Sequence, residues 1–170
     1  GWTYIKLYQY DNAIPEYEKA LEIYDKWESK PAWDANYTGL GLAYHKTGQY
    51  EKEEKLYKKA ELDFPDDPPL IYRQAILAWT EGDSISGNDY INKYISLRKE
   101  SSASQADIIT SLAEIYSEAG IPDKAEEHYR RAISLEPENP LRLNNLAYFL
   151  IDKDRNIAEG LDLVNMALKS

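Results

Sequence analysis

The chain of 170 residues contains no cysteine, which excludes disulfide bonds and thiolate metal sites. It has two histidines, His45 and His128, and they lie far from the His-Glu-x-x-His spacing of zinc enzymes. No glycine-rich phosphate loop occurs, and no motif places a nucleophile on a turn beside a base. We therefore expect no enzymatic activity, no catalytic residue, no metal site and no cofactor.

Basic residues are also in short supply, because 20 Lys and Arg face 30 Asp and Glu, for a formal net charge of -10. Such a chain repels phosphate backbones and anionic membrane surfaces on average, so nucleic acid is not an expected partner. No stretch approaches the roughly 20 apolar residues that span a bilayer. The first residues, Gly-Trp-Thr-Tyr, lack the pattern of a signal peptide. We expect no membrane insertion, and both cytoplasm and periplasm stay open as locations.

What the chain does contain is an internal repeat. Gly48, Gly82 and Gly120 each follow one apolar helical segment and precede another, at intervals of 34 and 38 residues. Small residues recur in step with these glycines, with one bulky exception, at Ala20, Ala60, Tyr94, Ala132 and Ala167. A period near 34 residues predicts a stack of similar structural units.

The clearest unit is predicted to be a helical hairpin. Tyr37, Leu40, Gly41 and Tyr44 are spaced to lie on one buried stripe of a helix. Gly48 then ends that helix, since glycine adopts positive φ without a side-chain clash. A second helix follows, with an apolar stripe of its own that includes Tyr57 and Ala60, and Pro65 ends it.

These residues resemble the tetratricopeptide family, whose pattern is bulky-x2-Leu-Gly-x2-Tyr, then Ala-x3-Phe, then Pro. The unit just described departs from the pattern at Glu53, where the family usually has alanine. The fourth unit matches at Ile109, Leu112, Ala113, Tyr116, Ala125, Tyr129, Ala132 and Pro137. The degenerate third unit has Ile71, Gln74, Ala75, Ala78, Gly87, Ile91 and Tyr94. The fifth has Leu143, Leu146, Ala147, Leu150, Gly160, Val164 and Ala167, and the truncated first has Gly1, Tyr4, Ala13, Tyr17 and Ala20.

The resemblance implies an all-α fold, a right-handed α-solenoid of about five antiparallel helical hairpins. The expected organisation is one array over 1–170, with units at roughly 1–31, 32–67, 68–103, 104–138 and 139–170. The first unit starts inside its own first helix, and no polar capping helix follows the last unit. We therefore expect the array to be part of a longer protein.

Local signals agree with this division. Asp67 before Pro68 and Asn139 before Pro140 are expected helix N-caps. Ser102 with Gln105 is expected to form a capping box. The longer spacings fall near 28–33 and 99–104, where longer second helices or connections would absorb them.

The resemblance also implies a binding groove lined by the first helix of each hairpin. Its expected contact residues are Trp2, Leu42, His45, Tyr72, Arg73, Ile76, Trp79, Asn144, Asn145 and Tyr148. In the fourth unit the same face carries Thr110, Glu114 and Ser117, so the groove is expected to be aromatic at one end and polar or acidic at the other. An alternative for Trp79 and Tyr72 is packing against adjacent hairpins, because aromatic residues at helical spacing are usually core.

Some family members hold a chaperone's carboxylate tail with a clamp of lysine, arginine and asparagine. The corresponding positions here hold Thr38, Gly39 and Leu42 in the second unit and Asp107, Thr110 and Ser111 in the fourth. Asn145 matches the amide that bonds a bound peptide's backbone, and Arg73 is an isolated cation. A neutral or basic apolar peptide is therefore expected rather than an acidic tail.

Three functional hypotheses follow. The leading one is a protein-interaction scaffold that binds a protein or peptide segment in the groove. The second is self-association into homo-oligomers, with Trp2 packing against the face of Leu163 and Met166 from another copy. The third is a regulatory array within a larger enzyme or signalling protein.

Overall fold

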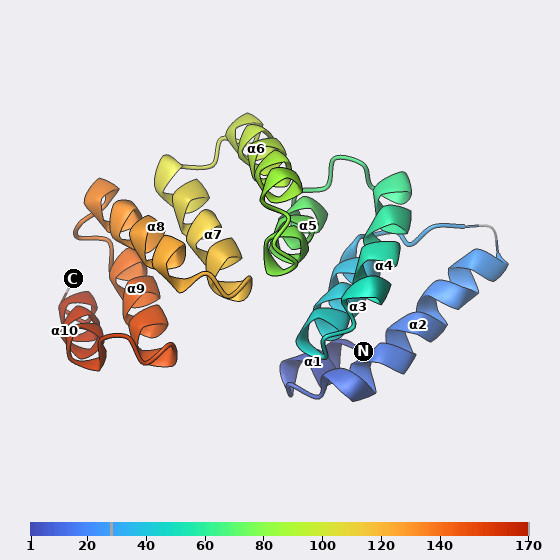
Figure 1. Ribbon diagram of the computed structural model, residues 1–170, viewed down its shortest axis with the longest axis horizontal. Helices are drawn as coiled ribbons and strands as arrows, with labels where there is room; N and C mark the ends of the chain where they lie inside the picture. The colour runs from blue at the N-terminus through green and yellow to red at the C-terminus, as the bar shows by residue number, and fades with distance from the viewer. Residues whose placement is uncertain (28, 170) are drawn as a thin grey trace. The chain divides into compact units, whose positions relative to one another are not determined.

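The computed structural model describes residues 1–27 and 29–169 (Figure 1). These residues form ten helices and no strand, which confirms the predicted all-α hairpin architecture. The helices are α1 (Trp2–Lys6), α2 (Tyr10–Lys26), α3 (Ala35–Lys46), α4 (Tyr50–Asp63), α5 (Pro68–Thr80), α6 (Ser84–Glu100), α7 (Gln105–Glu118), α8 (Pro122–Leu135), α9 (Pro140–Asp152) and α10 (Ile157–Ala167).

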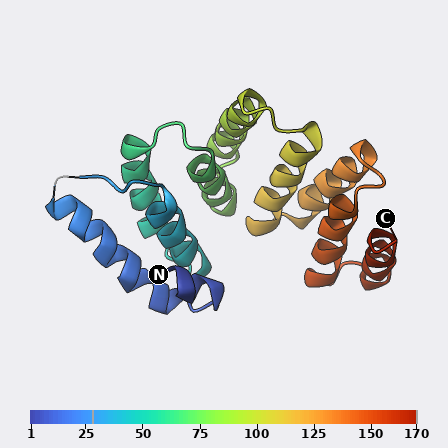
Figure 2. The same ribbon diagram turned by 180° about the vertical axis from the view of Figure 1, so that it is seen from behind.

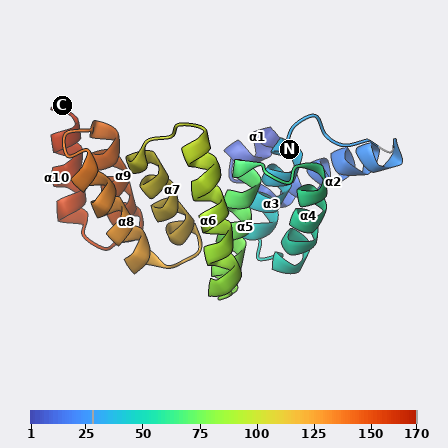
Figure 3. The same cartoon turned by 90° about the horizontal axis from the view of Figure 1, so that it is seen from above.

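The chain divides into two compact units, Gly1–Tyr94 and Ile95–Ser170, and the boundary falls inside α6. In the first unit α3 is central, since it contacts α1, α2, α4 and α5 (Figures 2 and 3). In the second unit α7 pairs with α8, α9 pairs with α10, and α8 also contacts α9. The single array over 1–170 stays a prediction.

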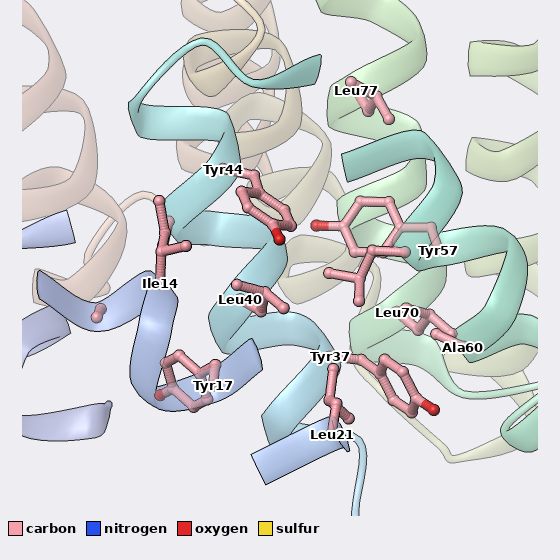
Figure 4. Packing of buried hydrophobic residues seen from close by; sticks show 13 residues of the cluster. Ile14, Tyr17, Leu21, Tyr37, Leu40, Tyr44, Tyr57, Ala60, Leu70 and Leu77 are labelled. Carbon is pink, nitrogen blue, oxygen red and sulfur yellow. The ribbon is translucent and has the colours of Figure 1, made fainter. Parts of the chain in front are cut away.

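The core of the first unit is built on the predicted stripe of α3. Tyr37, Leu40 and Tyr44 are buried between side chains of α2 and α4 (Figure 4). Their hydroxyl groups reach polar partners at the edge of the core: Tyr37 Oη donates to Asp63 Oδ2 at 2.6 Å and Tyr44 Oη to Glu18 Oε1 at 2.5 Å. Burial and these neighbouring carboxylates raise the pKa of both tyrosines, so both stay neutral.

Glycine turns end the first helices of three hairpins, as predicted. Gly48, Gly82 and Gly120 have φ of 71°, 81° and 75°, in the left-handed region that a side chain disfavours. In each of these hairpins, the second helix starts two residues after the glycine. The chain therefore reverses direction sharply at each of these positions.

The capping predictions are confirmed at two sites and wrong at one. The Asp67 carboxylate accepts a hydrogen bond from the Leu70 amide, and the Asn139 side chain accepts one from the Leu141 amide. At α7 the N-cap is Ser104 and not Ser102, which has φ 61° in the preceding turn. Ser104 Oγ accepts from the Asp107 amide at 3.0 Å and donates to Asp107 Oδ2 at 2.8 Å.

Longer second helices absorb part of the irregular spacing, as expected. Helices α2 and α6 have 17 residues each, whereas α4 and α8 have 14. Of the predicted segment 28–33, position 28 lies outside the described residues.

Candidate peptide-binding site

The first unit contains a pocket of about 290 Å³ between α1, α2, α3 and α5. Three of the predicted groove residues, Trp2, Leu42 and Arg73, lie in its wall. The full lining is Trp2, Ile5, Tyr17, Ala35, Asn36, Thr38, Gly39, Leu42 and Arg73. Residues far apart in sequence thus converge on one concave surface, which is the usual form of a small binding site.

Two glycines shape one wall of this pocket. A Cβ added to Gly39 would lie 2.6 Å from Tyr17 Cζ, and one added to Gly1 would lie 2.7 Å from the same atom. The Tyr17 ring is therefore packed tightly against both backbones and is buried. Burial raises the pKa of Tyr17, so its side chain is a neutral part of the wall.

The chemistry of the pocket is mainly apolar with a few polar groups. Trp2 is 65% exposed, and Lys6 Nζ lies 5.0 Å from its ring centroid. Arg73 is half-buried, with its guanidinium carbon 5.5 Å from the Tyr72 ring centroid. Asn36 adds an amide to the same wall. Such a lining suits an apolar side chain together with polar peptide groups.

Two other predicted groove residues, His45 and Ile76, are buried, at 7% and 1% exposure. His45 Nδ1 lies 3.0 Å from Glu53 Oε2, and Glu53 is itself 1% exposed. The side chains of His45 and Ile76 are therefore not on the surface of the first unit. The pair also accounts for Glu53 at a position where the family usually has alanine. Its pKa is raised by burial and lowered in part by His45, with burial the larger effect.

Tyr72 and Trp79 are half-buried and pack within the hairpin of α5 and α6. The Tyr72 ring centroid lies 5.9 Å from that of Tyr94. The Trp79 indole packs against Gly87, where an added Cβ would lie 2.6 Å from Nε1. Both residues thus pack within their own hairpin, whereas the alternative from the sequence expected packing against adjacent hairpins.

In the second unit the predicted residues lie on α9. Asn144 and Tyr148 are exposed, Tyr148 at 69%, and Asn145 is half-buried. Leu141, also exposed, is three residues before Asn144, so Leu141, Asn144 and Tyr148 share one face of the helix. This exposed face of α9 is a surface of the second unit that a partner protein can contact.

Sequence reasoning missed a buried arginine network in the second unit. Arg142 is 5% exposed and pairs with Asp107, while its Nε donates to Glu136 Oε2 at 2.9 Å and its Nη1 to Thr110 Oγ1 at 3.3 Å. Arg142 lowers the pKa of Asp107. Thr110, which was assigned to the groove, and Asp107, which corresponds to a clamp position, are thus partners of an internal cation. The arginine directly after the apolar Leu141 gave no signal in the repeat pattern.

Within 1–27 and 29–169, no helix combines the length and apolar character needed to cross a membrane. The same residues bring together no group of three potential metal-binding side chains.

The chain belongs to the tetratricopeptide repeat family. The family model described as "Tetratricopeptide repeat" matches residues 1–26, 35–61 and 106–139, about half of the chain. Proteins of this family are typically non-enzymatic scaffolds that bind proteins or peptides, and the fold therefore suggests a protein-interaction scaffold.

Comparison with individual proteins supports the same fold. Photosystem I assembly protein Ycf3 of Prochlorococcus marinus subsp. pastoris is 27% identical over 94 residues, covering 55% of this chain and 54% of that protein. The chain thus spans about half the length of this curated relative.

Two solved structures each cover 98% of this chain. The crystal structure of MamA aligns at 20% identity over 91% of that chain, with a TM-score of 0.54. The tetratricopeptide protein TTC0263 of Thermus thermophilus aligns at 21% identity over 86% of that chain, with a TM-score of 0.56. At this identity the likeness concerns the fold alone.

Proposed function

We propose that the chain is a protein-binding scaffold whose first unit captures an apolar peptide segment in the pocket lined by Trp2, Leu42 and Arg73. The observation that carries this proposal is the convergence of these three residues on one pocket of about 290 Å³. The largely exposed Trp2 can bury further apolar area on binding, and tryptophan is enriched among residues that dominate interface energies. The name of the relative Ycf3, a photosystem I assembly protein, agrees with a scaffold function.

The polar groups at the pocket define the ligand further. Asn36 can bond a peptide backbone, and Arg73 can bond a carbonyl oxygen or a carboxylate. The net charge of -10 disfavours a strongly acidic ligand overall. We propose a neutral or basic segment with one bulky apolar side chain seated between Trp2 and Leu42. The exposed face of α9 with Asn144 and Tyr148 is proposed as a contact surface of the second unit.

Selection from a displayed library of random 12-residue peptides tests this function, with affinities measured for synthetic copies of the enriched sequences. Trp2→Ala is expected to weaken binding about tenfold or more, as for a central interface residue. Trp33→Ala is the matched control, because Trp33 is 78% exposed and lies outside the pocket lining. Equal affinities for the wild type, Trp2→Ala and Leu42→Ser would contradict the proposal.

Self-association is a second candidate, favoured by the apolar surface of α10. Leu161 and Met166 are 54% and 51% exposed on this helix, and Leu163 is partly buried. Trp2 would supply the other face in a neighbouring copy. Sedimentation velocity at several concentrations decides, because a strict monomer removes this candidate.

A further inference from the structure

The degenerate third hairpin creates a second pocket in the first unit. Where α3 carries Leu40 and Tyr44, the repeat register gives α5 Gln74 and Ala78. Both α3 side chains fill the core, whereas α5 has a small residue at the position of the tyrosine. A pocket of about 120 Å³ lies beside Gln74 and Ala78, between α4, α5 and α6. It shares no lining residue with the peptide pocket.

The wall of this pocket includes the side-chain amide of Gln74. Gln74 is 5% exposed as a residue, and no hydrogen bond connects its side chain to the rest of the described chain. A group that fills the pocket displaces water from this amide, so a hydrogen bond to the amide offsets the loss of hydration. The amide is therefore suited to bond a polar group that enters the pocket.

The charges around the pocket favour a cation. Three carboxylates line it, those of Glu54, Glu81 and Asp83, against one ammonium group, that of Lys58. Lys58 Nζ is bound to Glu54 at 2.7 Å, which leaves Glu81 and Asp83 in excess. Asp83 also caps α6 by accepting from the amides of Ile85 and Ser86.

The remaining walls are apolar and aromatic. Leu77 and Ala78 contribute aliphatic surface, and Tyr57 and Tyr90 contribute rings. Burial raises the pKa of Tyr90, so its hydroxyl stays neutral. A guanidinium group combines a delocalised charge with a flat face that packs on aromatic rings and with five donors. An ammonium group is more strongly hydrated and lacks the flat face.

We propose that this pocket binds the guanidinium group of an arginine side chain from a partner protein, with the Gln74 carbonyl and the Glu81 carboxylate as acceptors. The site is distinct from the expected groove. Its α5 residues are Gln74, Leu77 and Ala78, which differ from the α5 residues expected in the groove, and α4 and α6 are second helices of their hairpins. It does not depend on the peptide pocket, and either site can fail while the other stands.

The probe for this site is N-acetyl-arginine methylamide, titrated into ¹⁵N-labelled chain and followed by the amide shifts of residues 74–90. Saturable shifts there are expected. The corresponding citrulline derivative, which is neutral and similar in shape, is expected to bind about tenfold more weakly or worse, because it lacks the charge that strengthens each hydrogen bond. Equal binding of the citrulline or lysine derivative would overturn the assignment to guanidinium.

Variants that are expected to weaken or to strengthen arginine binding distinguish this site from non-specific attraction between the arginine probe and the acidic chain. Gln74→Leu restores the family residue and is expected to weaken arginine binding about tenfold. Glu81→Gln is expected to weaken it about two- to fivefold, as for an exposed charge pair. Lys58→Met removes the competing cation and is expected to strengthen binding.

The control for these variants is Glu22→Gln, because Glu22 is an exposed acid on α2 and is not part of the pocket lining. It changes the net charge as Glu81→Gln does and is expected to leave the affinity unchanged. The proposal is overturned if Gln74→Leu binds as the wild type does, or if Glu22→Gln and Glu81→Gln weaken binding equally. Binding of selected peptides in the Trp2 pocket is measured in the same variants and is expected to be unaffected.

Discussion

The indole of Trp79 lies directly against the backbone of Gly87, so that a Cβ at position 87 would stand 2.6 Å from the indole Nε1. Gly87→Ala is therefore expected to destabilise the first unit by about 1–3 kcal/mol through overpacking. The corresponding fall in melting temperature is about 4–8 °C per kcal/mol. All four tryptophans lie in the first unit, so tryptophan fluorescence reports its unfolding selectively.

The partner of this contact provides the control. Trp79→Leu in the Gly87→Ala background is expected to recover part of the loss, because the smaller side chain makes room for the methyl group. Asn88→Ala, at an exposed position on the same helix, is expected to change little. An unchanged melting temperature for Gly87→Ala would show that Trp79 does not pack at this position.

The buried pair of His45 and Glu53 gives a prediction with a pH signature. His45→Ala leaves a buried carboxylate and is expected to cost about 2–3 kcal/mol at pH 7. His45→Ala with Glu53→Ala, which restores the family's alanine, is expected to recover most of this loss. A double variant no more stable than the single one would contradict the pairing.

The sign of the pH effect follows from the raised pKa of Glu53. A raised folded-state pKa gives stability that is present below the unfolded value near 4.5 and is lost as pH rises through the folded value. His45 lowers this pKa in the wild type, so its removal raises the pKa further. The His45→Ala variant is therefore expected to be closest to the wild type at about pH 4, by fluorescence-monitored urea unfolding.

The Arg142 network predicts the opposite pH dependence in the second unit. Arg142 lowers the pKa of Asp107, so this pair contributes stability above the unfolded value near 3.8 and loses it as pH falls through the folded value. Because the Asp107 side chain is 44% exposed, the contribution is about 1 kcal/mol or less. Arg142→Met is expected to reduce the acid-induced loss of stability, measured by amide hydrogen exchange in α7 and α9.

Arg142→Lys is the informative companion variant. It keeps the charge but loses the planar set of donors that reaches Asp107, Glu136 and Thr110 together. Intermediate behaviour is expected. Identical pH profiles for wild type and Arg142→Met would contradict the role assigned to the pair.

Much of the fold could be predicted because the same helical-hairpin pattern recurs several times along the sequence. The spacing of Tyr37, Leu40 and Tyr44 predicted a buried stripe, and Gly48 predicted a left-handed turn; the structure confirms both. Helical spacing alone could not separate groove from core at His45, because its burial depends on Glu53 in the next helix.

The binding site was harder to predict, because it too depends on contacts between helices and not on the spacing within one helix. Trp2, Leu42 and Arg73 come from three different helices. The sequence pattern predicts which face of each helix a residue occupies, but it does not predict which residues of the other helices lie beside it. The second pocket results from the small side chain of Ala78 in the degenerate third hairpin, at the repeat position where α3 has Tyr44. A sequence pattern built on the residues that are present does not reveal a space left by a smaller one. Ser102 and Ser104 both precede a helix, and the observed cap is the residue whose partner three positions later is Asp107.

The central claim is that the pocket of Trp2, Leu42 and Arg73 is where a peptide binds. Its most direct test places the photo-crosslinking residue p-benzoylphenylalanine at position 42 and, as a control, at exposed position 33, and irradiates each with a library-selected peptide. The account predicts a peptide adduct at position 42, competed by unlabelled peptide, and none at position 33. A peptide that binds with wild-type affinity but gives no adduct at position 42 would contradict it.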